Sequence, residues 1–467
     1  MKSSALSYLF PDSEHYSGLL IWAFGADIQM FFTCLTKSRK YRIFVFRDWK
    51  IDANDNQLSD MKNTILAFLA TVGMAITACD NAGNKSTAGF AEAALMPYVE
   101  SGQLAGAISV LYNDGVEEVA CVGYSDLAAG RKITMDDVFM QCSQTKGFCG
   151  VTMAKLVEEG KVSLDDPVSK YLPEFRDLWV LEGESDSLRT LRRARNPLTI
   201  RMALNHTGGF PFEASVKRND VRGGGWSGGA PIRQVAAVAA DSPLRFEPGT
   251  SVLYSNTGID IAAAVIEEVT GMKWEQYLKQ TVLDPLGMKS TWFWPTDRQL
   301  RTQVEMYRTK EGGKAEYVRE HPWEQRPYND SHVFASAGAG LWSTANDQLK
   351  FYKMLMNLGM GENGVRILEE ETVKSILARS TRPAGFDGYS LGLVAPVEDT
   401  EDSWFGHGGA WGTNCMVNWH KKQLKLFVIQ ISDSTSPWHD DLEKAQNDFF
   451  AAEIDNSGSD AYTGRTE

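Results

Sequence analysis

Strand-like segments fall near both ends of the main body of this 467-residue chain, and helical patterns fill the middle. The turn Asn113-Asp114-Gly115 separates two apolar runs, which is a strong hairpin signal. The runs typical of strands are 105–112, 117–124, 388–394, 413–419 and 424–431. Strands at the two ends predict an antiparallel sheet, flanked by helices, that both ends of the chain build together. The helical middle would form an inserted lobe, so the expected fold class is α+β rather than alternating βαβ.

Apolar residues at helical spacing define the other elements and the limits of the main domain. The expected helices are 89–101, 143–160, 199–205, 231–240, 256–270, 273–282, 344–358, 368–378 and 437–452. The charged stretch 181–197 is expected to be exposed. The glycine-rich stretch 221–230 is expected to be a mobile loop or a place of close backbone packing. With 43% hydrophobic residues, the domain at 89–452 can bury a sizeable core, and 453–467 is expected to be a flexible tail.

Residues 61–79 carry the pattern of an export signal. A short positive start at Met61 leads into an apolar run and then into small residues before Cys79. The pattern resembles a bacterial lipoprotein signal peptide with its lipobox at 76–79. We therefore expect cleavage before Cys79, a lipid on its thiol, and a tether at 80–88. The main domain would then be anchored by lipid to a membrane of a bacterial cell envelope and would lie outside the cytoplasm.

The first sixty residues fit this interpretation only if translation starts later. A signal peptide does not begin at position 61, so our hypothesis is that Met61 is the true start and that 1–60 reflects a start-site error. The alternative treats 17–35 as a membrane span. Asp27 lies in the middle of that run, where a charge costs about 2.5–3.5 kcal/mol on insertion scales.

Charge and cysteine spacing argue against two classes of partner. The formal net charge of −13 repels phosphate backbones, so nucleic acid is not an expected partner. The chain has no Cys-x-x-Cys motif and no dense Cys/His spacing, so no metal site is expected. Cys121, Cys142, Cys149 and Cys415 lie in the main domain, and the sequence leaves their pairing and the oligomeric state open.

Ser143 and Lys146 form the first candidate catalytic pair. Residues three apart on a helix lie on one face, one turn from each other. A serine hydroxyl needs a base to become a nucleophile, and a lysine can be that base if burial or nearby positive charge lowers its pKa. The motif alone is weak, because a helix-capping serine beside a solvated lysine gives the same pattern.

Two further motifs could complete a site. Tyr254 could shuttle protons and Asn256 could hold a substrate carbonyl, although Asn256 also fits a plain helix cap. His407 is followed by Gly408 and Gly409, which would let the backbone approach a substrate and leave the N–H of Ala410 free to point at it. A glycine-rich hairpin turn would explain the second motif without any function.

Seven phrases in order give the chain a family resemblance over about 88–450. They are SQTK at 143–146 and the segments 156–175, 198–211, 246–260, 284–293, 338–351 and 405–414. The chain resembles the serine β-lactamase-related family, which includes class C β-lactamases, D-alanyl-D-alanine carboxypeptidases and related esterases. The resemblance implies a β-lactamase/transpeptidase-like fold, a covalent acyl-enzyme that is then hydrolysed, and no cofactor.

The resemblance also implies a role for each candidate residue. Ser143 would be the acylated nucleophile, Lys146 its activating neighbour and Tyr254 the proton-transfer partner. Asn256 would position substrate near Lys146, and the backbone N–H groups of Ser143 and Ala410 would form the oxyanion hole. Cys142 is expected to pack in the interior. His206 is expected to be structural, since a histidine beside a glycine turn commonly bonds backbone groups.

One departure from the family pattern bears on the substrate. β-Lactamases and peptidases of this family usually carry Lys-Thr-Gly where this chain has His407-Gly408-Gly409, and that lysine helps to hold a substrate carboxylate. A histidine is mostly neutral at pH 7, so the anchor would be weaker. The departure favours a small ester, amide or peptide as substrate over a β-lactam. The alternatives are a β-lactamase or D,D-carboxypeptidase and, from another class, a non-catalytic penicillin-binding-type receptor.

Overall fold

The computed structural model divides the chain into two units, Met1–Ser86 and Thr87–Glu467. It describes the backbone of four strands in the first unit, and in the second it describes residues 89–185, 188–213, 230–309, 313–318, 332–431 and 436–452. The first-unit strands pair antiparallel in the order β1-β2-β3-β4. They are β1 (Ala5–Pro11), β2 (Tyr16–Phe24), β3 (Asp27–Leu35) and β4 (Tyr41–Lys50). The stretch 17–35, the alternative membrane span, therefore contains two strands.

Several sequence predictions lie outside the described residues. They are the signal segment 61–79 with Cys79, the tether 80–88, the tail 453–467, and all but the last residue of 221–230. Within the described part of the chain, no helix combines the length and the apolar character that a membrane crossing requires.

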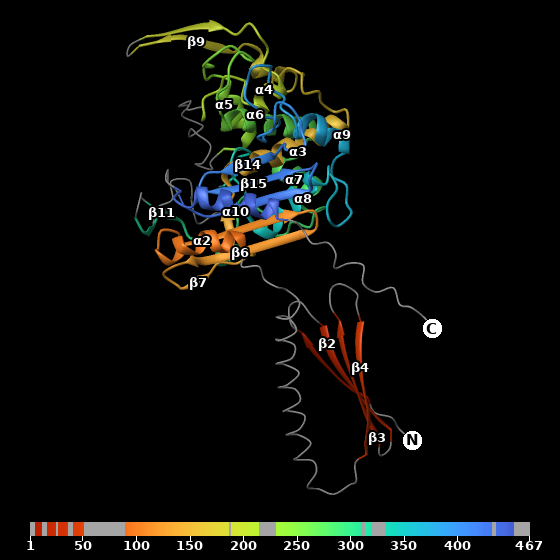
Figure 1. Ribbon diagram of the computed structural model, residues 1–467. Helices are drawn as coiled ribbons and strands as arrows, with labels where there is room; N and C mark the ends of the chain where they lie inside the picture. The colour runs from red at the N-terminus through yellow and green to blue at the C-terminus, as the bar shows by residue number, and fades with distance from the viewer. Residues whose placement is uncertain are drawn as a thin grey trace. The chain divides into compact units, whose positions relative to one another are not determined.

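A six-stranded antiparallel sheet forms the centre of the second unit. Its order is β14-β15-β16-β5-β6-β7, so strands from both ends of the unit lie side by side (Figure 1). The strands are β5 (Gly106–Asn113), β6 (Val116–Asp126), β7 (Arg131–Lys132), β14 (Phe405–Gly409), β15 (Thr413–Asn418) and β16 (Gln423–Val428). The two chain ends meet where β16 pairs with β5, with Gln423 opposite Asn113. The predicted α+β class and the sheet built from both ends are confirmed.

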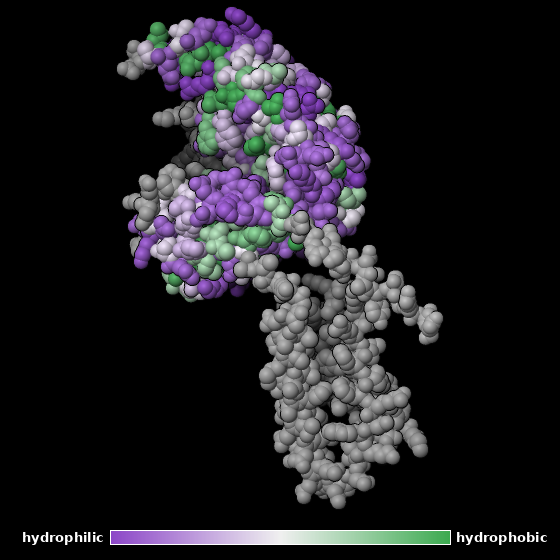
Figure 2. Space-filling model, in the orientation of Figure 1, coloured by the Kyte–Doolittle hydropathy of each residue, from purple (hydrophilic) through white to green (hydrophobic). Residues whose placement is uncertain are grey.

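Helices cover both faces of this sheet. On one face, α2 (Phe90–Glu100) and α10 (His439–Ala451) pack on each other, and Leu95, Trp438 and Phe449 join the apolar cluster there (Figure 1). Figure 2 shows hydrophilic residues gathered over the outer side of α10. On the other face, α3 (Thr145–Glu158) and α8 (Ala345–Met356) belong to the larger core, in which the rings of Phe148 and Phe351 stack 3.8 Å apart.

The middle of the chain forms the predicted helical lobe, with α6 packed against α3, α4 and α5. Its helices are α4 (Ile200–Leu204), α5 (Ile232–Ala239), α6 (Asn256–Thr270) and α7 (Trp274–Leu278). The charged stretch 181–197 is exposed for most of its length, as expected. It also forms part of the hairpin β9 (Trp179–Glu184) and β10 (Arg189–Arg193), which the sequence pattern did not indicate.

The prediction of a strand at 388–394 was wrong. Residues there make only isolated bridges, Tyr389 to Val394 and Val394 to Gly406. The reason is Gly392, which has a φ of +72° and whose Cβ position would lie only 2.3 Å from the backbone oxygen of Lys146. The segment therefore turns so that its backbone can press against the start of α3. The strand lies instead at β14, in the glycine motif itself.

Candidate active site

The nucleophile candidate stands at the junction of a strand and a helix. Strand β8 (Val138–Met140) leads into a 3-10 turn, η1 (Cys142–Gln144), and α3 begins at Thr145. Cys142 takes a positive φ of 49°, which is uncommon for a side-chain-bearing residue and turns the chain sharply just before Ser143. The turn brings Ser143 Oγ to 3.0 Å from Lys146 Nζ. The predicted pair is thus assembled, with the serine half-buried and the lysine fully buried.

Lys146 is held from three sides. Its ammonium nitrogen donates to Ser143 Oγ, to Asn256 Oδ1 at 2.6 Å and to the backbone oxygen of Gly338 at 2.6 Å. Burial disfavours the charged form and lowers the pKa of Lys146 to about 7, although the nearby Asp260 carboxyl opposes the shift. A lysine with such a pKa is neutral in a large share of molecules at physiological pH. It can therefore accept the proton of Ser143.

Asn256 reaches Lys146 because a neighbour caps the helix. The side chain of Ser255 accepts from Gly258 N at 3.1 Å, so Ser255 is the cap of α6 and Asn256 is the first helical residue. The alternative interpretation of Asn256 as the helix cap is therefore wrong. Its amide oxygen bonds Lys146 Nζ instead.

Tyr254 lies against the same pair. It lines the same pocket as Ser143, and Lys146 Nζ is 4.7 Å from the centre of its ring. Burial raises the pKa of Tyr254 to about 12, although the nearby hydroxyl of Ser143 opposes the shift. Tyr254 is therefore a neutral phenol at pH 7, able to donate a proton or pass one on. Lys146 is the group whose pKa suits a base.

Asp260 is a site residue that the sequence analysis missed. It is buried on α6, one turn after Asn256, and its carboxylate accepts from the backbone nitrogens of Ala337 at 2.8 Å and Gly338 at 3.2 Å. These bonds fix the segment whose carbonyl oxygen meets Lys146. Burial raises the pKa of Asp260 to about 7. The i, i+4 spacing from Asn256 was the available signal, since it places both residues on one helix face.

The glycine motif forms β14, the edge strand of the sheet, beside the turn that carries Ser143. A Cβ on Gly409 would lie 2.2 Å from the backbone oxygen of Gln141 and 2.3 Å from Thr413 Oγ1. Only glycine allows this approach, which brings Ala410 next to the nucleophile turn. The glycine motif therefore lies at an edge of the sheet, next to the nucleophile turn. Ser143 and Gly408, Gly409 and Ala410 line one pocket.

His407 is not a cation in this setting. It is buried, its Nε2 is 2.9 Å from the hydroxyl of Tyr389, and its Nδ1 contacts the backbone oxygen of Gly408. Burial lowers the pKa of His407 to about 3, and the positive charge of Lys146 adds to this. The imidazole is therefore neutral across the physiological range, so a carboxylate has no charged partner at this position.

His206 sits behind Tyr254, with ring centres 4.4 Å apart. Its Nδ1 accepts from Ser255 N at 3.3 Å, and its backbone oxygen accepts from Leu253 N at 3.0 Å. Burial holds its pKa well below the usual range. These contacts place His206 where it supports the Tyr254 segment, as a structural histidine would.

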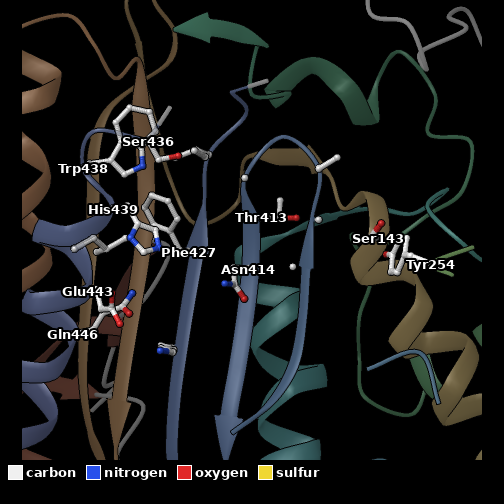
Figure 3. Close-up of a pocket in the computed structure, with 17 residues that line it drawn as sticks. Ser143, Tyr254, Thr413, Asn414, Phe427, Ser436, Trp438, His439, Glu443 and Gln446 are labelled. Atoms are coloured by element: carbon white, nitrogen blue, oxygen red, sulfur yellow. The ribbon is translucent and has the colours of Figure 1, made fainter. Parts of the chain in front are cut away.

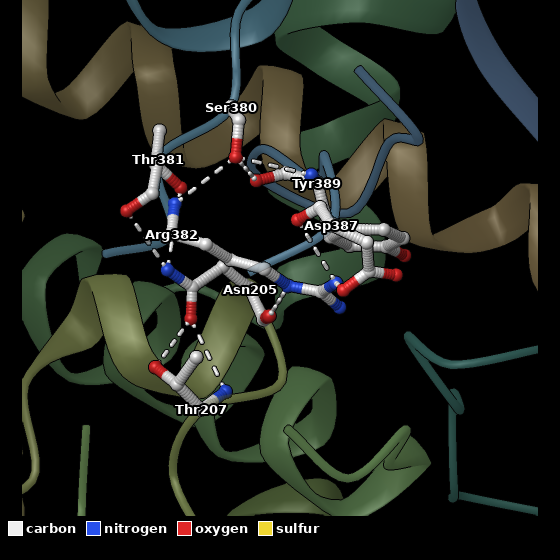
Figure 4. Close-up of polar contacts among 7 residues, drawn as sticks. All are labelled: Asn205, Thr207, Ser380, Thr381, Arg382, Asp387 and Tyr389. Atoms are coloured by element: carbon white, nitrogen blue, oxygen red, sulfur yellow. Dashed lines mark hydrogen bonds and ion pairs between the residues drawn. The ribbon is translucent and has the colours of Figure 1, made fainter. Parts of the chain in front are cut away.

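A buried arginine ties the loop after residue 380 to the turn that holds His206. Arg382 Nε donates to the backbone oxygen of Asn205 at 2.8 Å, and its guanidinium stacks 4.9 Å from the ring centre of Tyr389 (Figure 4). Asn205 returns a bond of 3.1 Å to the backbone oxygen of Thr381. Through Tyr389 and its bond to His407, this network connects the helical lobe with β14.

The cysteines carry no catalytic role in this arrangement. Cys121, Cys142, Cys149 and Cys415 are free thiols. Burial raises the pKa of Cys142 to about 12, so its thiol stays protonated beside the nucleophile, in keeping with packing. In the described ranges no three His, Cys, Asp or Glu side chains lie together in a way that could hold a metal ion.

A pocket of about 540 Å³ begins at Ser143 and Tyr254 and extends across β14 toward α10. Figure 3 shows Ser143 and Tyr254 on one side of the strands, and Trp438, His439 and Glu443 on the other.

A sequence model of the family described as Beta-lactamase matches residues 91–453. The chain therefore belongs to the β-lactamase family, whose members are serine hydrolases, and the predicted resemblance is confirmed. Protein Rv1367c of Mycobacterium tuberculosis is 31% identical to it over 329 residues, which are 70% of this chain and 78% of the relative. A putative D-alanyl-D-alanine carboxypeptidase of Escherichia coli is 27% identical over 342 residues, which cover 69% of this chain and 75% of the relative.

Solved structures share the fold. EstCE1, a hydrolase with promiscuous acyltransferase activity, aligns with a TM-score of 0.61 at 20% identity and covers 76% of this chain and 97% of its own. Unliganded simvastatin synthase (LovD) from Aspergillus terreus aligns with a TM-score of 0.62 at 20% identity and covers 76% of this chain and 96% of its own. At these identities the likeness bears on the fold alone, and it confirms the predicted β-lactamase/transpeptidase-like architecture.

Proposed function

We propose that this protein is a serine hydrolase that forms an acyl-enzyme at Ser143 and acts on a small ester, amide or peptide. The observation that carries the proposal is the 3.0 Å contact between Ser143 Oγ and Lys146 Nζ, a lysine whose pKa burial lowers to about 7. A base matched to the operating pH, within hydrogen-bond reach of a hydroxyl, is what nucleophilic catalysis needs.

The residues suggest a sequence of steps. Lys146 accepts the proton of Ser143 as Oγ attacks the substrate carbonyl, and the backbone N–H groups of Ser143 and Ala410 bind the oxyanion. Tyr254, which lines the pocket beside Ser143, passes the proton to the leaving group as the bond between the leaving group and the carbonyl carbon breaks. Water then attacks the acyl-enzyme, and its proton returns through the same groups to restore Ser143.

The neutral His407 supports an ester, or a small amide or peptide, over a β-lactam. A β-lactam carries a carboxylate next to its reactive ring, and the position that would face it offers an imidazole whose pKa is about 3. D,D-carboxypeptidase activity is the second candidate, and the name of the Escherichia coli relative favours it. A non-catalytic receptor of the penicillin-binding type has no chemical need for Ser143, Lys146 and Tyr254 together.

Hydrolysis of 4-nitrophenyl acetate and butyrate, measured beside nitrocefin with Ser143→Ala as control, tests the proposal. We expect ester turnover that vanishes in the variant, with nitrocefin left almost untouched. Efficient nitrocefin turnover would favour the β-lactamase alternative. Failure of a fluorophosphonate probe to label Ser143, together with absence of all turnover, would favour the receptor.

A further inference from the structure

The far end of the active-site pocket carries a charged group that the proposed chemistry does not use. The wall there is formed by β15, β16 and the start of α10, and Lys425 of β16 lines it. In the strand register Lys425 lies opposite Met416, and Phe427, two residues on, lies opposite Asn414. Because alternate residues of a strand share a face, Lys425, Phe427 and Asn414 face the same side of the sheet, toward the pocket.

Lys425 has no carboxylate partner among the described residues. Its ammonium lies 5.0 Å from the ring centre of Trp404, and within the described part of the chain it forms no ion pair with an Asp or Glu. Burial lowers the pKa of Lys425, and Glu443 is near enough to oppose that shift. A half-buried ammonium that has an aromatic face on one side and no ion pair with the nearby Glu443 is stabilised when an anion comes into direct contact with it.

The cationic groups next to the nucleophile are not available for this task. Lys146 already donates hydrogen bonds to Ser143, Asn256 and Gly338. His407 is neutral at physiological pH. Along the described wall of the pocket, Lys425 is thus the lysine or arginine that a substrate can reach.

We propose that Lys425 is the anchor for a carboxylate at the end of an elongated substrate, which runs from Ser143 over the glycine strand β14. The proposal deepens the proposed function and rests on it, since it names the substrate class of the same site. The anchor lies on a strand two places from β14, so it selects long substrates with a terminal carboxylate rather than compact ones.

The sheet geometry sets the length of such a substrate. Neighbouring strands lie about 4.8 Å apart and residues about 3.3 Å apart along a strand, so the backbone positions of Gly408 and Lys425 are separated by roughly 12 Å. With carbon–carbon bonds of about 1.5 Å, an extended chain of roughly eight to ten bonds spans that distance. A short dicarboxylic half-ester spans less than this separation.

Glu443 limits which anions fit. It lines the pocket on α10 and acts on Lys425 through its charge, while His439 stands one turn earlier on the same helix. A carboxylate that meets Lys425 must keep clear of Glu443. We therefore expect Glu443→Gln to strengthen the preference for carboxylate substrates, because the variant removes the repulsion and keeps the shape.

Two substrate series test whether Lys425 binds a carboxylate. They also show whether that carboxylate lies on the acyl group or on the leaving group of the substrate. In the first, 4-nitrophenyl half-esters of dicarboxylic acids of increasing length place it on the acyl chain. In the second, acetate esters of ω-hydroxy acids place it on the leaving group. For each length the readout is the ratio of kcat/KM to that of the same chain ending in a methyl group. We expect the ratio to rise about tenfold near the matched length in one series, the scale of a charge-assisted hydrogen bond.

Matched variants link that ratio to the residue. Lys425→Met should bring the ratio down about tenfold, to the level of short chains, and Lys425→Arg should keep most of it. Lys421→Met makes the same charge change at a lysine outside the pocket, in an exposed pair with Asp402, and should leave the ratio alone. A thermal melt of each variant checks that it is folded. A kcat/KM ratio near one at every chain length would contradict the proposed role of Lys425. A ratio that does not change in Lys425→Met would contradict it as well.

A binding measurement keeps the anchor testable if the proposed function fails. Calorimetry with suberic acid monoamide and the Ser143→Ala variant requires no turnover, so it reports on the subsite alone. If Lys425→Met weakens binding about tenfold but the wild type hydrolyses no ester, the carboxylate-binding role of Lys425 is supported and the proposed hydrolase activity is contradicted. If ester turnover requires Ser143 but neither binding nor substrate preference depends on Lys425, the hydrolase activity is supported and the carboxylate-binding role of Lys425 is contradicted.

Discussion

At the scale of single residues, the site depends on an opposition between burial and charge at Lys146. Burial disfavours its ammonium form, and the Asp260 carboxyl favours it. The two groups are joined through Gly338, whose backbone nitrogen donates to Asp260 and whose oxygen accepts from Lys146. The balance leaves the pKa of Lys146 near 7, where the residue can exchange a proton with Ser143.

Replacing Asp260 by Asn should move the pH–rate profile. The active base is neutral Lys146, so activity rises as pH passes upward through its pKa. Asp260, whose own pKa is about 7, raises the pKa of Lys146 only in the molecules in which it is anionic, so Asp260→Asn should shift the acid limb of kcat/KM to lower pH by less than about one unit. Ester hydrolysis measured from pH 5 to 9 gives the profile.

A matched control exists for this prediction. Asp347 is also buried and also accepts a backbone bond, from Ser290 N at 2.6 Å, but it does not contact the site. Asp347→Asn should leave the acid limb in place. A loss of rate at all pH values without a shift of the limb would show that Asp260 acts only as a structural support.

The identities of the site residues could be read from sequence, but their ionisation could not. Ser143, Lys146, Tyr254 and Asn256 follow from motif and order, and the structure brings them together. Burial is a property of the whole fold, so no motif could show that His407 has a pKa near 3 or that Asp260 supports the loop at Gly338. Their catalytic roles remain predictions.

At the scale of elements, the close approach of β14 to the nucleophile turn depends on one glycine. Gly409→Ala would push Cβ into Gln141 and Thr413, so strand and turn must separate. The backbone N–H of Ala410, the proposed oxyanion donor, would then move away from the turn that carries Ser143. We expect kcat for ester hydrolysis to fall about 10²- to 10³-fold, the cost of losing one oxyanion-hole donor.

The neighbouring glycine provides the comparison. A Cβ on Gly408 would meet nothing closer than 3.5 Å, which is ordinary contact. Gly408→Ala should therefore keep kcat within a few-fold of wild type, with any effect in KM because the residue lines the pocket. Equal losses of kcat in the two variants would contradict the role given to the approach of Gly409.

The buried Arg382 should matter for stability more than its exposed ion partner. Its side chain is 4% exposed, whereas that of Asp387 is 80% exposed. Arg382→Met leaves the backbone oxygen of Asn205 without its donor, and we expect the free energy of unfolding to fall by about 1–3 kcal/mol. Asp387→Asn should cost no more than about 1 kcal/mol. Urea unfolding of both variants measures the difference, and equal effects would refute it.

Element positions followed from sequence where a strong periodic pattern was present. The hairpin at Asn113-Asp114-Gly115 and most helices lie where apolar spacing placed them. The prediction failed at 388–394, where close packing of Gly392 on α3 overrode an apolar run, and at β9 and β10, whose exposed surfaces carry no alternation that marks a strand. Long-range packing decided both cases.

At the scale of the whole molecule, the fold explains how distant parts of the sequence form one site. Because β16 pairs with β5, the two ends of the second unit meet in one sheet, and its edge strand β14 comes to rest beside the turn that precedes α3. The helical lobe between them supplies Tyr254 and Asn256. The pocket that results extends from the nucleophile to the last helix of the domain, α10.

The proposed anchoring to a cell envelope also belongs to this scale. In a bacterial host we expect the protein in the membrane fraction, with Cys79 as its first residue and a diacylglyceryl group on the thiol, because 76–79 reads as a lipobox. Mass spectrometry of the N-terminal peptide identifies both features. Cys79→Ser should abolish lipidation and leave ester hydrolysis within a few-fold of wild type, since the catalytic residues lie in the second unit. Peptides from 1–60 in the natural host would refute the start at Met61. An unmodified Cys79 would refute the lipid anchor.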